Sequence, residues 1–389
     1  MATDQVPALV SYPAEPTKLT PDWRFEKIKV SRPPKEHELK IRMVATGICH
    51  TDILVASIPG EQMGLKFPRV LGHEGAGVVE EVGPGVTVAR VGDPVLLSYS
   101  YCDACDLCKS SEQPYCAAWP LLNIVGDATI FQTGAGAEVP GKFFGQSSFA
   151  ATSIVGEASV VNVRDLLGSG GGGGGHDDLK LLAPLGCGLM TGSGAIVNGA
   201  AAKPHDVVLV TGIGAVGLGA IMAAKIAGCK EIVAVDRVAR RLEIAKELGA
   251  TKVLDTSTIP SGGSIAESVQ QLVANQRISI VIETTGAVPV VEDCMKALGR
   301  RGRFIQLGVP RPDAQVTLPV GEFFSSNKSY ECHYLGNTTG QAWIPVMIQW
   351  WREGKFPIEK IVKQFPAEDA LQALHGMEDG SVIKPVLIW

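Results

Sequence analysis

The stretch VVLVTGIGAVGLGAIMAAKIAGCKEIVAVD, from Val207 to Asp236, decides the fold of this chain. Its first four residues form a β-branched, apolar run that is typical of a strand buried on both faces of a parallel sheet. The pattern G-x-G-x-x-G follows, formed by Gly212, Gly214 and Gly217. The first glycine permits a sharp turn, the second lets a pyrophosphate approach the backbone, and the third lets a helix pack closely on the strand.

A helix is expected after this turn, from about 215 to 227, and then a second apolar strand from Glu231 to Val235. Asp236 ends that strand, at the position where a carboxylate binds the adenosine ribose in dinucleotide-binding folds. A carboxylate repels a 2′-phosphate, so Asp236 favours NAD, whereas the neighbouring Arg237 keeps NADP as an alternative. The charge-free stretch Val207–Ala224 also approaches the length of a membrane span, but four glycines and a strand-like start argue against one.

The bulk composition sets further limits. A chain of 389 residues is too long for one core and indicates two domains, and 46% hydrophobic with 19% charged residues is typical of a globular protein. The net charge of −5 and the lack of a basic patch argue against nucleic acid as a partner. The first nineteen residues hold no apolar core of signal-peptide length, so we expect a cytoplasmic protein. Nine cysteines in such a protein indicate metal binding or catalysis and not disulfides.

Two bends in the first hundred residues carry metal-binding side chains. The alternating run Glu38–Ala45 predicts a half-buried strand that leads to a turn at Cys49. His73 and Glu74 lie in a second, glycine-rich bend between apolar runs. A cysteine and a histidine brought together by two bends suit zinc, although a core cysteine and a buried histidine are the alternative for each residue alone.

A second group of cysteines has a more specific spacing. The segment CDACDLCKSSEQPYC has the pattern C-x2-C-x2-C-x7-C, formed by Cys102, Cys105, Cys108 and Cys116. Four thiolates at this spacing can complete a tetrahedral zinc shell with no position left for a substrate. The segment therefore predicts a structural zinc site.

Five motifs together resemble the zinc-dependent medium-chain alcohol dehydrogenases, and the aryl and benzyl alcohol dehydrogenases most of all. They are G-I-C-H-T-D at 47–52, G-H-E-G-A-G at 72–77, the four-cysteine segment, G-C-G at 186–188 and G-I-G-A-V-G at 212–217. The resemblance implies an α/β fold with a GroES-like, largely β catalytic domain and a Rossmann domain with a doubly wound parallel sheet. It implies domain limits of 1–187 and 336–389 for the catalytic domain and 188–335 for the Rossmann domain.

The resemblance also implies roles for single residues. The catalytic zinc ligands would be Cys49, His73 and Cys187, a ligand set already known for alcohol dehydrogenase. Asp52 would orient the ligand histidine, Glu74 would lie behind the metal, and Thr51 would bond the substrate oxygen. The residues implied in binding the nicotinamide cofactor are His50, Thr191, Gly212, Gly214, Val216, Gly217, Asp236, Arg241, Leu307 and Lys384.

The implied reaction is reversible hydride transfer between a primary or secondary alcohol and NAD, with two zinc ions per chain and no role for a membrane. Leu54 stands where many relatives have a histidine that ends a proton relay, which predicts a shortened relay and an apolar site suited to aromatic or allylic alcohols. Trp119, Phe131, Phe143, Phe144 and Phe149 are candidates for lining a substrate channel, and packing of the zinc lobe is the alternative. A dedicated biosynthetic substrate, or a cofactor-binding sensor without turnover, are the alternative functions.

Two further segments carry expectations about assembly and flexibility. Residues 324–335 have the pattern of a more polar strand, and in the family this region pairs two subunits, so a homodimer is expected, with a tetramer as the alternative. The run GSGGGGGG at Gly168–Gly175 has no strand before it and predicts a surface loop inserted relative to the family.

Overall fold

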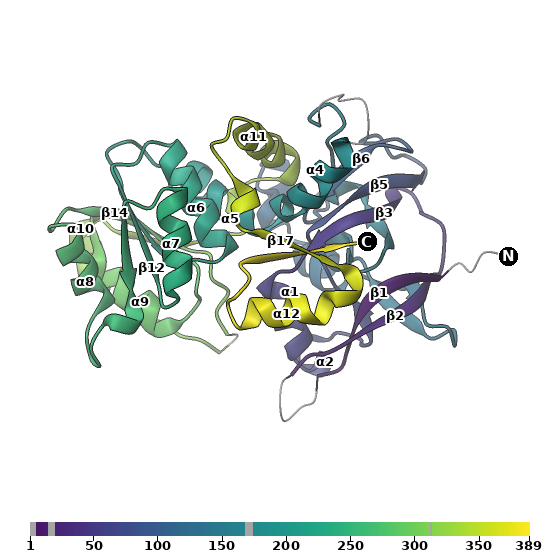
Figure 1. Cartoon of the computed structure of the whole chain (residues 1–389), viewed down its shortest axis with the longest axis horizontal. Helices are drawn as coiled ribbons and strands as arrows, with labels where there is room; N and C mark the ends of the chain where they lie inside the picture. The colour runs from purple at the N-terminus through teal and green to yellow at the C-terminus, as the bar shows by residue number, and fades with distance from the viewer. Residues whose placement is uncertain (1–4, 15–19, 168–173, 312) are drawn as a thin grey trace. The chain divides into compact units, whose positions relative to one another are not determined.

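The computed structural model describes residues 5–14, 20–167, 174–311 and 313–389. The chain divides into two compact units. Unit 1 comprises Met1–Cys187, Thr339–Gln349 and Ile361–Trp389, and unit 2 comprises Gly188–Thr338 and Trp350–Lys360. Each unit has its own sheet structure and its own hydrophobic core (Figure 1).

Unit 2 is built on a six-stranded parallel sheet in the order β13-β12-β11-β14-β15-β16. Its strands are β11 (Val207–Thr211), β12 (Glu231–Asp236), β13 (Lys252–Asp255), β14 (Ile278–Glu283), β15 (Leu298–Gln306) and β16 (Ser329–Cys332). Its helices are α5 (Gly188–Gly194), α6 (Ala215–Ile226), α7 (Ala239–Leu248), α8 (Ile265–Leu272), α9 (Val288–Ala297) and α10 (Val320–Ser326). Figure 1 shows α6 and α7 on one side of the strands and α8 and α9 on the other, which confirms the predicted doubly wound fold.

The turn after β11 has the backbone geometry that the glycine pattern predicts. All five residues of β11 are buried, as expected for a central strand of a parallel sheet. Gly212 follows with φ +83°, a conformation that side chains rarely adopt, and a Cβ atom there would lie 2.5 Å from Oγ1 of Thr284. The chain therefore reverses at once and α6 begins at Ala215.

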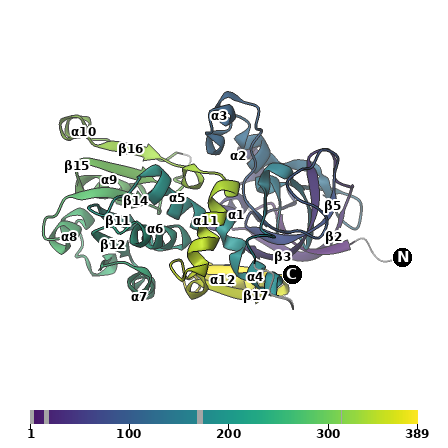
Figure 2. The same cartoon turned by 90° about the horizontal axis from the view of Figure 1, so that it is seen from above.

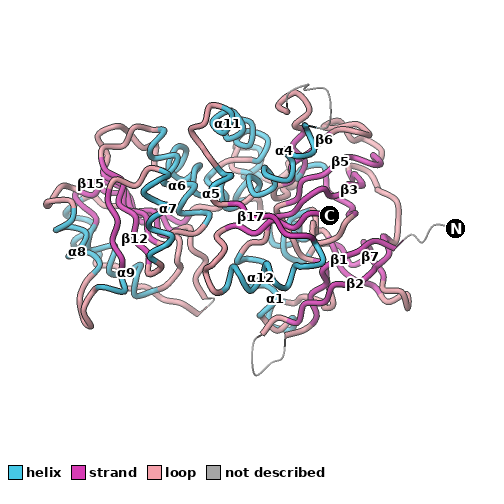
Figure 3. Tube along the Cα trace, in the orientation of Figure 1, coloured by secondary structure: helices cyan, strands magenta, loops and turns pink. Residues whose placement is uncertain are grey.

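Unit 1 consists mainly of two sheets (Figure 3). The seven-stranded sheet has the order β10-β6-β5-β3-β18-β17, with β9 also paired to β3, and the five-stranded sheet has the order β4-β1-β2-β7-β8. Their strands are β1 (Gln5–Tyr12), β2 (Asp22–Val30), β3 (Glu38–Gly47), β4 (Arg69–Val70), β5 (Gly75–Val82), β6 (Pro94–Leu97), β7 (Asp127–Gln132), β8 (Glu138–Gly141), β9 (Thr152–Gly156), β10 (Val160–Asn162), β17 (Val362–Pro366) and β18 (Lys384–Ile388). The helices are α1 (His50–Ser57), α2 (Gly60–Met63), α3 (Asp106–Lys109), α4 (Gly174–Leu182), α11 (Gly340–Arg352), most of which belongs to unit 1, and α12 (Ala370–Glu378).

The register of the larger sheet positions the first metal-binding cluster. Thr46 near the end of β3 pairs with Gly75 at the start of β5, and Gly47 pairs with Val386 of β18. Because β3 is antiparallel to both neighbours, its end lies beside the starts of β5 and β18. The residues next to these three strand termini therefore lie close together. Those residues include Cys49, His73 and Lys384.

Two expectations from the sequence need comment. The strand predicted over 324–335 is wrong in its first part, because α10 continues to Ser326 and Asn327, in the left-handed conformation, ends it. Only Ser329–Cys332 form the strand, which lies at the edge of the sheet beside β15 (Figure 2). Most of the surface loop predicted at Gly168–Gly175 lies outside the described residues, and its last two residues begin α4.

The apolar stretch 207–224 forms β11 and most of α6 and not one long helix. Within the part of the chain that the structure describes, no single helix has both the length and the hydropathy of a membrane span. One pair of helices, over 177–186 and 188–199, has that length and hydropathy when the two are taken together, but the pair is bent by 57°.

Candidate active site and metal centres

The carboxylate of Asp52 joins the two bends that the sequence singled out. Its Oδ2 accepts the backbone N–H of Cys49 at 3.0 Å, and its Oδ1 accepts the backbone N–H of Gly72 at 3.0 Å. The same Oδ1 lies 2.9 Å from Nδ1 of His73. This contact fixes the imidazole with Nδ1 as the donor, so Nε2 presents its lone pair. Among the described residues, Nε2 of His73 is buried and has no hydrogen-bond partner.

Three further metal-binding side chains lie near the imidazole of His73. One ligand atom each from Cys49, His73, Glu74 and Cys187 all lie within 4.8 Å of one another. Cys187 reaches the cluster because the preceding Gly186 packs directly on β6. A Cβ atom on Gly186 would lie 1.9 Å from the carbonyl oxygen of Leu97. Hydrogen bonding with Cys187 lowers the pKa of the Cys49 thiol well below 9.0, against the effect of burial. A thiolate and a neutral imidazole nitrogen are the ligands that zinc prefers.

A buried ion pair lies behind this cluster. Nζ of Lys384 lies 2.7 Å from the carboxylate of Glu74 and also donates to the carbonyl oxygen of Ile48 at 2.9 Å. Burial raises the pKa of Glu74 to about 7 even though Lys384 opposes that shift. A Cβ atom on Gly47 would lie 2.0 Å from Glu74, so the pair needs a glycine at that position. The ammonium group of Lys384, which the sequence assigned to the cofactor, is thus committed to Glu74 and Ile48.

Aromatic rings cover the His73 imidazole. Phe144 stacks on it with ring centroids 4.5 Å apart, and Phe143 meets it edge-on at 5.6 Å. Trp119 meets Phe144 edge-on at 5.5 Å. Of the five aromatic residues proposed for a channel, these three adjoin the metal-binding cluster, whereas Phe149 packs on Trp23 of β2.

Sequence reasoning missed the residue that holds the His73 bend in place. Nε2 of Gln146 donates to the carbonyl oxygens of His73 and Ser98, each at 2.9 Å, and its Oε1 accepts the N–H of Gly75 at 3.0 Å. The side chain is fully buried, so these bonds also satisfy its polar atoms. No motif marks Gln146 in the sequence, and only its burial in the fold identifies it.

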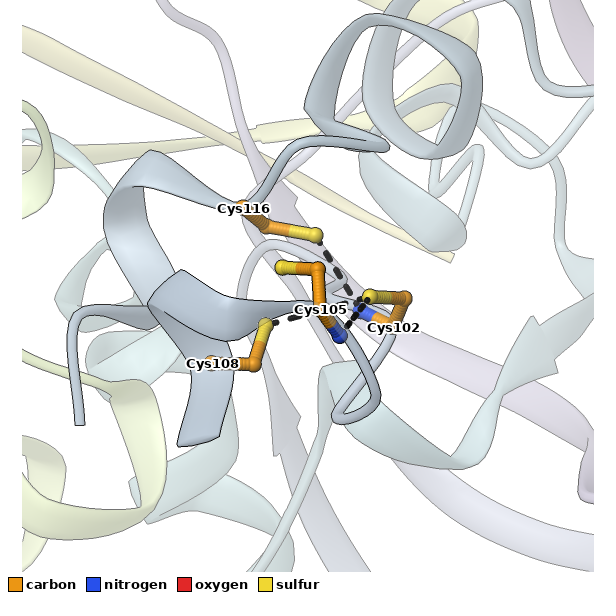
Figure 4. Close-up of side chains that lie close together, drawn as sticks. All are labelled: Cys102, Cys105, Cys108 and Cys116. Atoms are coloured by element: carbon orange, nitrogen blue, oxygen red, sulfur yellow. Dashed lines mark hydrogen bonds between the residues drawn. The ribbon is translucent and has the colours of Figure 1, made fainter. Parts of the chain in front are cut away.

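The second cluster of cysteines forms around α3 (Figure 4). The four sulfur atoms lie within 4.8 Å of one another, as predicted from their spacing: Cys102, Cys105, Cys108 and Cys116. Backbone N–H groups point at the sulfurs, for example from Cys105 to Cys102 at 3.4 Å and from Ala117 to Cys105 at 3.5 Å. Donation from Ala117 and Cys108 lowers the pKa of Cys105 to about 6. Backbone bonds also lower the pKa of Cys102, whereas burial raises the pKa of Cys108 and of Cys116, so the lobe favours the thiolate at two of its four cysteines.

In unit 2, the three glycines of the pattern differ in what surrounds them. A Cβ atom on Gly217 would lie 2.1 Å from the carbonyl oxygen of Gly212, which fits close packing of α6 on the turn. At Gly214 nothing lies within 4 Å of the added atom, so the backbone is open to a ligand. Asp236 accepts the N–H of Ile213 at 2.6 Å and thereby ties the turn to the end of β12.

Comparison with known proteins agrees with these sites. Residues 35–165 match the family model of the alcohol dehydrogenase GroES-like domain, and residues 215–352 match that of the zinc-binding dehydrogenases. A geraniol dehydrogenase from Castellaniella defragrans is 33% identical over 368 residues, 94% of each chain. The chain belongs to the zinc-dependent alcohol dehydrogenases.

Solved structures support the same family. The benzyl alcohol dehydrogenase of Acinetobacter calcoaceticus superimposes with a TM-score of 0.86 at 32% identity over 99% of both chains. An alcohol dehydrogenase zinc-binding domain protein from Burkholderia ambifaria gives 0.88 at 33% identity, over 99% of this chain and 98% of the other. The predicted family, the GroES-like and Rossmann fold, and the reaction class are therefore confirmed, and this alcohol dehydrogenase uses zinc and a nicotinamide cofactor.

The remaining residues predicted from the sequence lie in two groups. His50, Thr51 and Asp52 begin α1 of unit 1, where Oγ1 of Thr51 lies 3.8 Å from the sulfur of Cys49. The other group belongs to unit 2 of the alcohol dehydrogenase and comprises Thr191 on α5, Val216 on α6, Arg241 on α7 and Leu307 after β15. Nε of Arg241 is buried without a hydrogen-bond partner among the described residues.

Proposed function

We propose that this enzyme oxidises aromatic and allylic alcohols, primary or secondary, to aldehydes or ketones with NAD, and that it catalyses the reverse reaction. The observation that carries the substrate class is the stacking of Phe144 on His73, with Trp119 next to it. These rings place flat apolar surface against a metal-binding side chain, where an unsaturated or aromatic substituent gains contact area. The relatives named for geraniol and for benzyl alcohol act on one allylic and one aromatic alcohol.

The catalytic zinc would be held by Cys49, His73 and Cys187. The orphaned Nε2 of His73 and the low pKa of Cys49 fit this ligand set. A bound zinc ion is a Lewis acid that lowers the pKa of an alcohol hydroxyl. Asp52 keeps His73 in the tautomer that binds a metal, and Glu74 with Lys384 supplies a buried charge pair behind the ligands.

Thr51 is the residue we assign to proton transfer. Its hydroxyl would accept the alcohol proton while it passes its own proton on, and a bound nicotinamide would supply the acceptor for the hydride, which carries two electrons away from the alcohol. Leu54, 36% exposed, offers no acceptor for the next step. With leucine at position 54, the proton would leave Thr51 by way of the ribose of a bound cofactor directly to water.

The cofactor would be bound by the turn at Gly212–Gly217 and the residues around it in unit 2. The open backbone at Gly214 accommodates a pyrophosphate, and Asp236 would accept the adenosine ribose hydroxyls. Asp236 favours NAD, and the exposed Arg237 leaves NADP as the second choice. His50 of unit 1 remains a proposal as a pyrophosphate contact. The same role for Lys384 would require its ammonium group to leave Glu74 and Ile48.

The four-cysteine cluster would hold a structural zinc ion. Four thiolates leave no coordination position open, so this ion takes no part in the reaction. Its role is to fold the lobe from 102 to 116, which contains one turn of α3 and little apolar core of its own.

We further propose a homodimer, with a tetramer as the alternative, formed through the edge strand β16. The segment around it exposes large apolar side chains, among them Phe324, 88% exposed, Val320, 67% exposed, and Val309, 58% exposed. An edge strand and an apolar patch side by side are typical of a subunit interface.

We also propose that the protein is cytoplasmic. All nine cysteines are free thiols, which fits the reducing cytoplasm.

The proposal is tested by following NADH or NADPH formation with the zinc-loaded protein over aliphatic, allylic and benzylic alcohols. We expect the highest kcat/KM with benzylic and cinnamyl-type alcohols and with NAD. Preference for short aliphatic alcohols would contradict the substrate class. Cofactor binding without turnover of any alcohol would support the alternative of a sensor.

A further inference from the structure

A cavity in unit 2 has no part in the proposed reaction. Its volume is about 660 Å³, and its lining includes Lys203, Asp206, Arg277, Arg300, Arg301 and Arg303. Asp206 immediately precedes β11 and Arg277 immediately precedes β14, so the cavity lies at the amino ends of the parallel strands. Because Gly212 and Gly214 follow the carboxyl end of β11, the cavity and the cofactor turn lie at opposite ends of the sheet.

The charge of this cavity is strongly unbalanced. Five of the lining residues named above are cationic and one is acidic. Asp206 accepts the backbone N–H of Lys203 at 2.8 Å, and its carboxylate lies 3.5 Å from Nη2 of Arg303. The pair of Asp206 with Arg303 leaves four of the five cations unbalanced. In the portion of the chain that is described, no carboxylate pairs with Lys203, Arg300 or Arg301. Three of the cations stand close together in sequence, at 300, 301 and 303, and the fold brings Lys203 and Arg277 to them.

The backbone at Arg301 is strained. Its φ is +54°, in the left-handed region that glycine adopts without cost and other residues adopt at about 1–2 kcal/mol. The strain lies within β15, where the pairing with β14 shifts register between Ile278 and Ile280. A glycine would satisfy this turn better, so an arginine here adds charge to the cavity at the expense of stability.

We propose that this cavity binds a compact phosphate polyanion, such as pyrophosphate or the polyphosphate group of a free nucleotide. Guanidinium groups match phosphate oxygens in pairs of parallel hydrogen bonds, and two segments contribute them here, one at Arg277 and one at 300–303. The volume lies within the range of roughly 300–1,000 Å³ that small-molecule sites occupy. A polymeric nucleic acid fits less well, because the cations surround one concavity and the whole chain carries a net charge of −5.

The test is a calorimetric titration of the zinc-loaded protein with inorganic pyrophosphate while NADH saturates the cofactor site. The test variant combines Arg300→Ser with Arg301→Gly, because the glycine relieves the strained φ and keeps the fold stable. The control variant combines Arg90→Ser with Arg352→Ser, which removes two exposed cations that do not line the cavity. Zinc content is measured afterwards, since pyrophosphate also binds metals.

We expect one pyrophosphate per chain, bound by the natural protein and by the control, and bound at least roughly tenfold more weakly by the test variant. ATP titrated in the same way should bind with similar strength if the phosphates are recognised. Absence of binding, equal binding by all three proteins, or binding of ATP or of a polyanionic polymer without binding of pyrophosphate would overturn the proposal.

Discussion

Oδ1 of Asp52 lies 2.9 Å from Nδ1 of His73, and both side chains are completely buried. The contact joins the start of α1 to the bend before β5, two segments separated by 21 residues in sequence. It determines which nitrogen of His73 is available to a metal, and therefore the geometry of the whole cluster depends on it.

Replacing this carboxylate tests that dependence. Asp52→Asn keeps the size of the side chain but removes its charge, so zinc at the Cys49–His73–Cys187 cluster should bind roughly 10- to 100-fold more weakly. Competition with a chelator measures the loss, which should affect one of the two zinc ions. Asp103→Asn, at an aspartate within the four-cysteine lobe that does not belong to the metal-binding cluster, is the control and should retain both ions. Unchanged zinc affinity in Asp52→Asn would remove the role we give to this contact.

The aromatic wall gives a prediction about specificity. Phe144→Leu removes the ring that stacks on His73, so kcat/KM for a cinnamyl-type alcohol should fall about tenfold, an effect of roughly 1.4 kcal/mol. Activity with a short aliphatic alcohol should change much less. Phe131→Leu, a buried ring of β7 outside this wall, is the matched control. Equal losses with both alcohols would show that Phe144 acts through stability and not through substrate contact.

Two glycines of one turn should respond differently to substitution by alanine, one by losing cofactor affinity and the other by losing stability. Gly214→Ala places a methyl group in open space, so the fold should stay intact while NADH binds at least roughly tenfold more weakly, because the pyrophosphate loses its contact with the backbone. Gly217→Ala drives a methyl group against the carbonyl of Gly212 and should lower the stability of unit 2 by about 1–3 kcal/mol. Thermal unfolding and NADH fluorescence separate the two effects. A Gly214→Ala protein with normal NADH affinity would show that the pyrophosphate lies elsewhere.

Acid stability should depend on Arg32. Burial would raise the pKa of Glu38, but bonds from Arg32, from the Lys35 backbone and from Lys142 lower it from 4.5 to about 2. A carboxyl group with a depressed folded pKa stabilises the fold above its unfolded value, and the contribution disappears as the pH falls from 4.5 toward 2. Arg32→Leu should therefore be less stable than the natural protein at neutral pH, and the difference should shrink across that window.

Urea unfolding at several pH values, followed by tryptophan fluorescence, measures this trend. Arg24→Leu is the control, since Arg24 and its partner Asp22 are both more than 40% exposed and their pair should contribute little. A stability difference for Arg32→Leu that stays constant from neutral pH to about 2 would contradict the assignment to Glu38.

Features encoded within short segments could be predicted from the sequence. Such features depend only on residues that are close in sequence, so a sequence pattern predicts them directly. They are the turn at Gly212, the cysteine cluster from Cys102 to Cys116, and the bends at Cys49 and His73. Assignment of Cys187 to the first cluster needed the family resemblance, because spacing alone does not bring residue 187 to residue 49.

Contacts between distant residues could not be predicted in this way. Glu74 and Lys384 are 310 positions apart, and only the pairing of β18 with β3 shows that Lys384 faces the metal-binding cluster. Gln146 bonds the His73 bend from 73 positions away, and no motif marks it. The basic cavity could not be predicted for the same reason, because only the strand order brings Lys203 and Arg277 to the arginines of β15.

The most direct test of the central claim compares the natural protein with His73→Gln for zinc content and for NAD reduction by benzyl alcohol. The account predicts two zinc ions per chain and rapid NADH formation for the natural protein. For the variant it predicts one ion, held by the four cysteines, unchanged NADH binding, and no alcohol-dependent NADH formation. Substantial turnover by a His73→Gln protein that holds only one zinc ion would contradict the account.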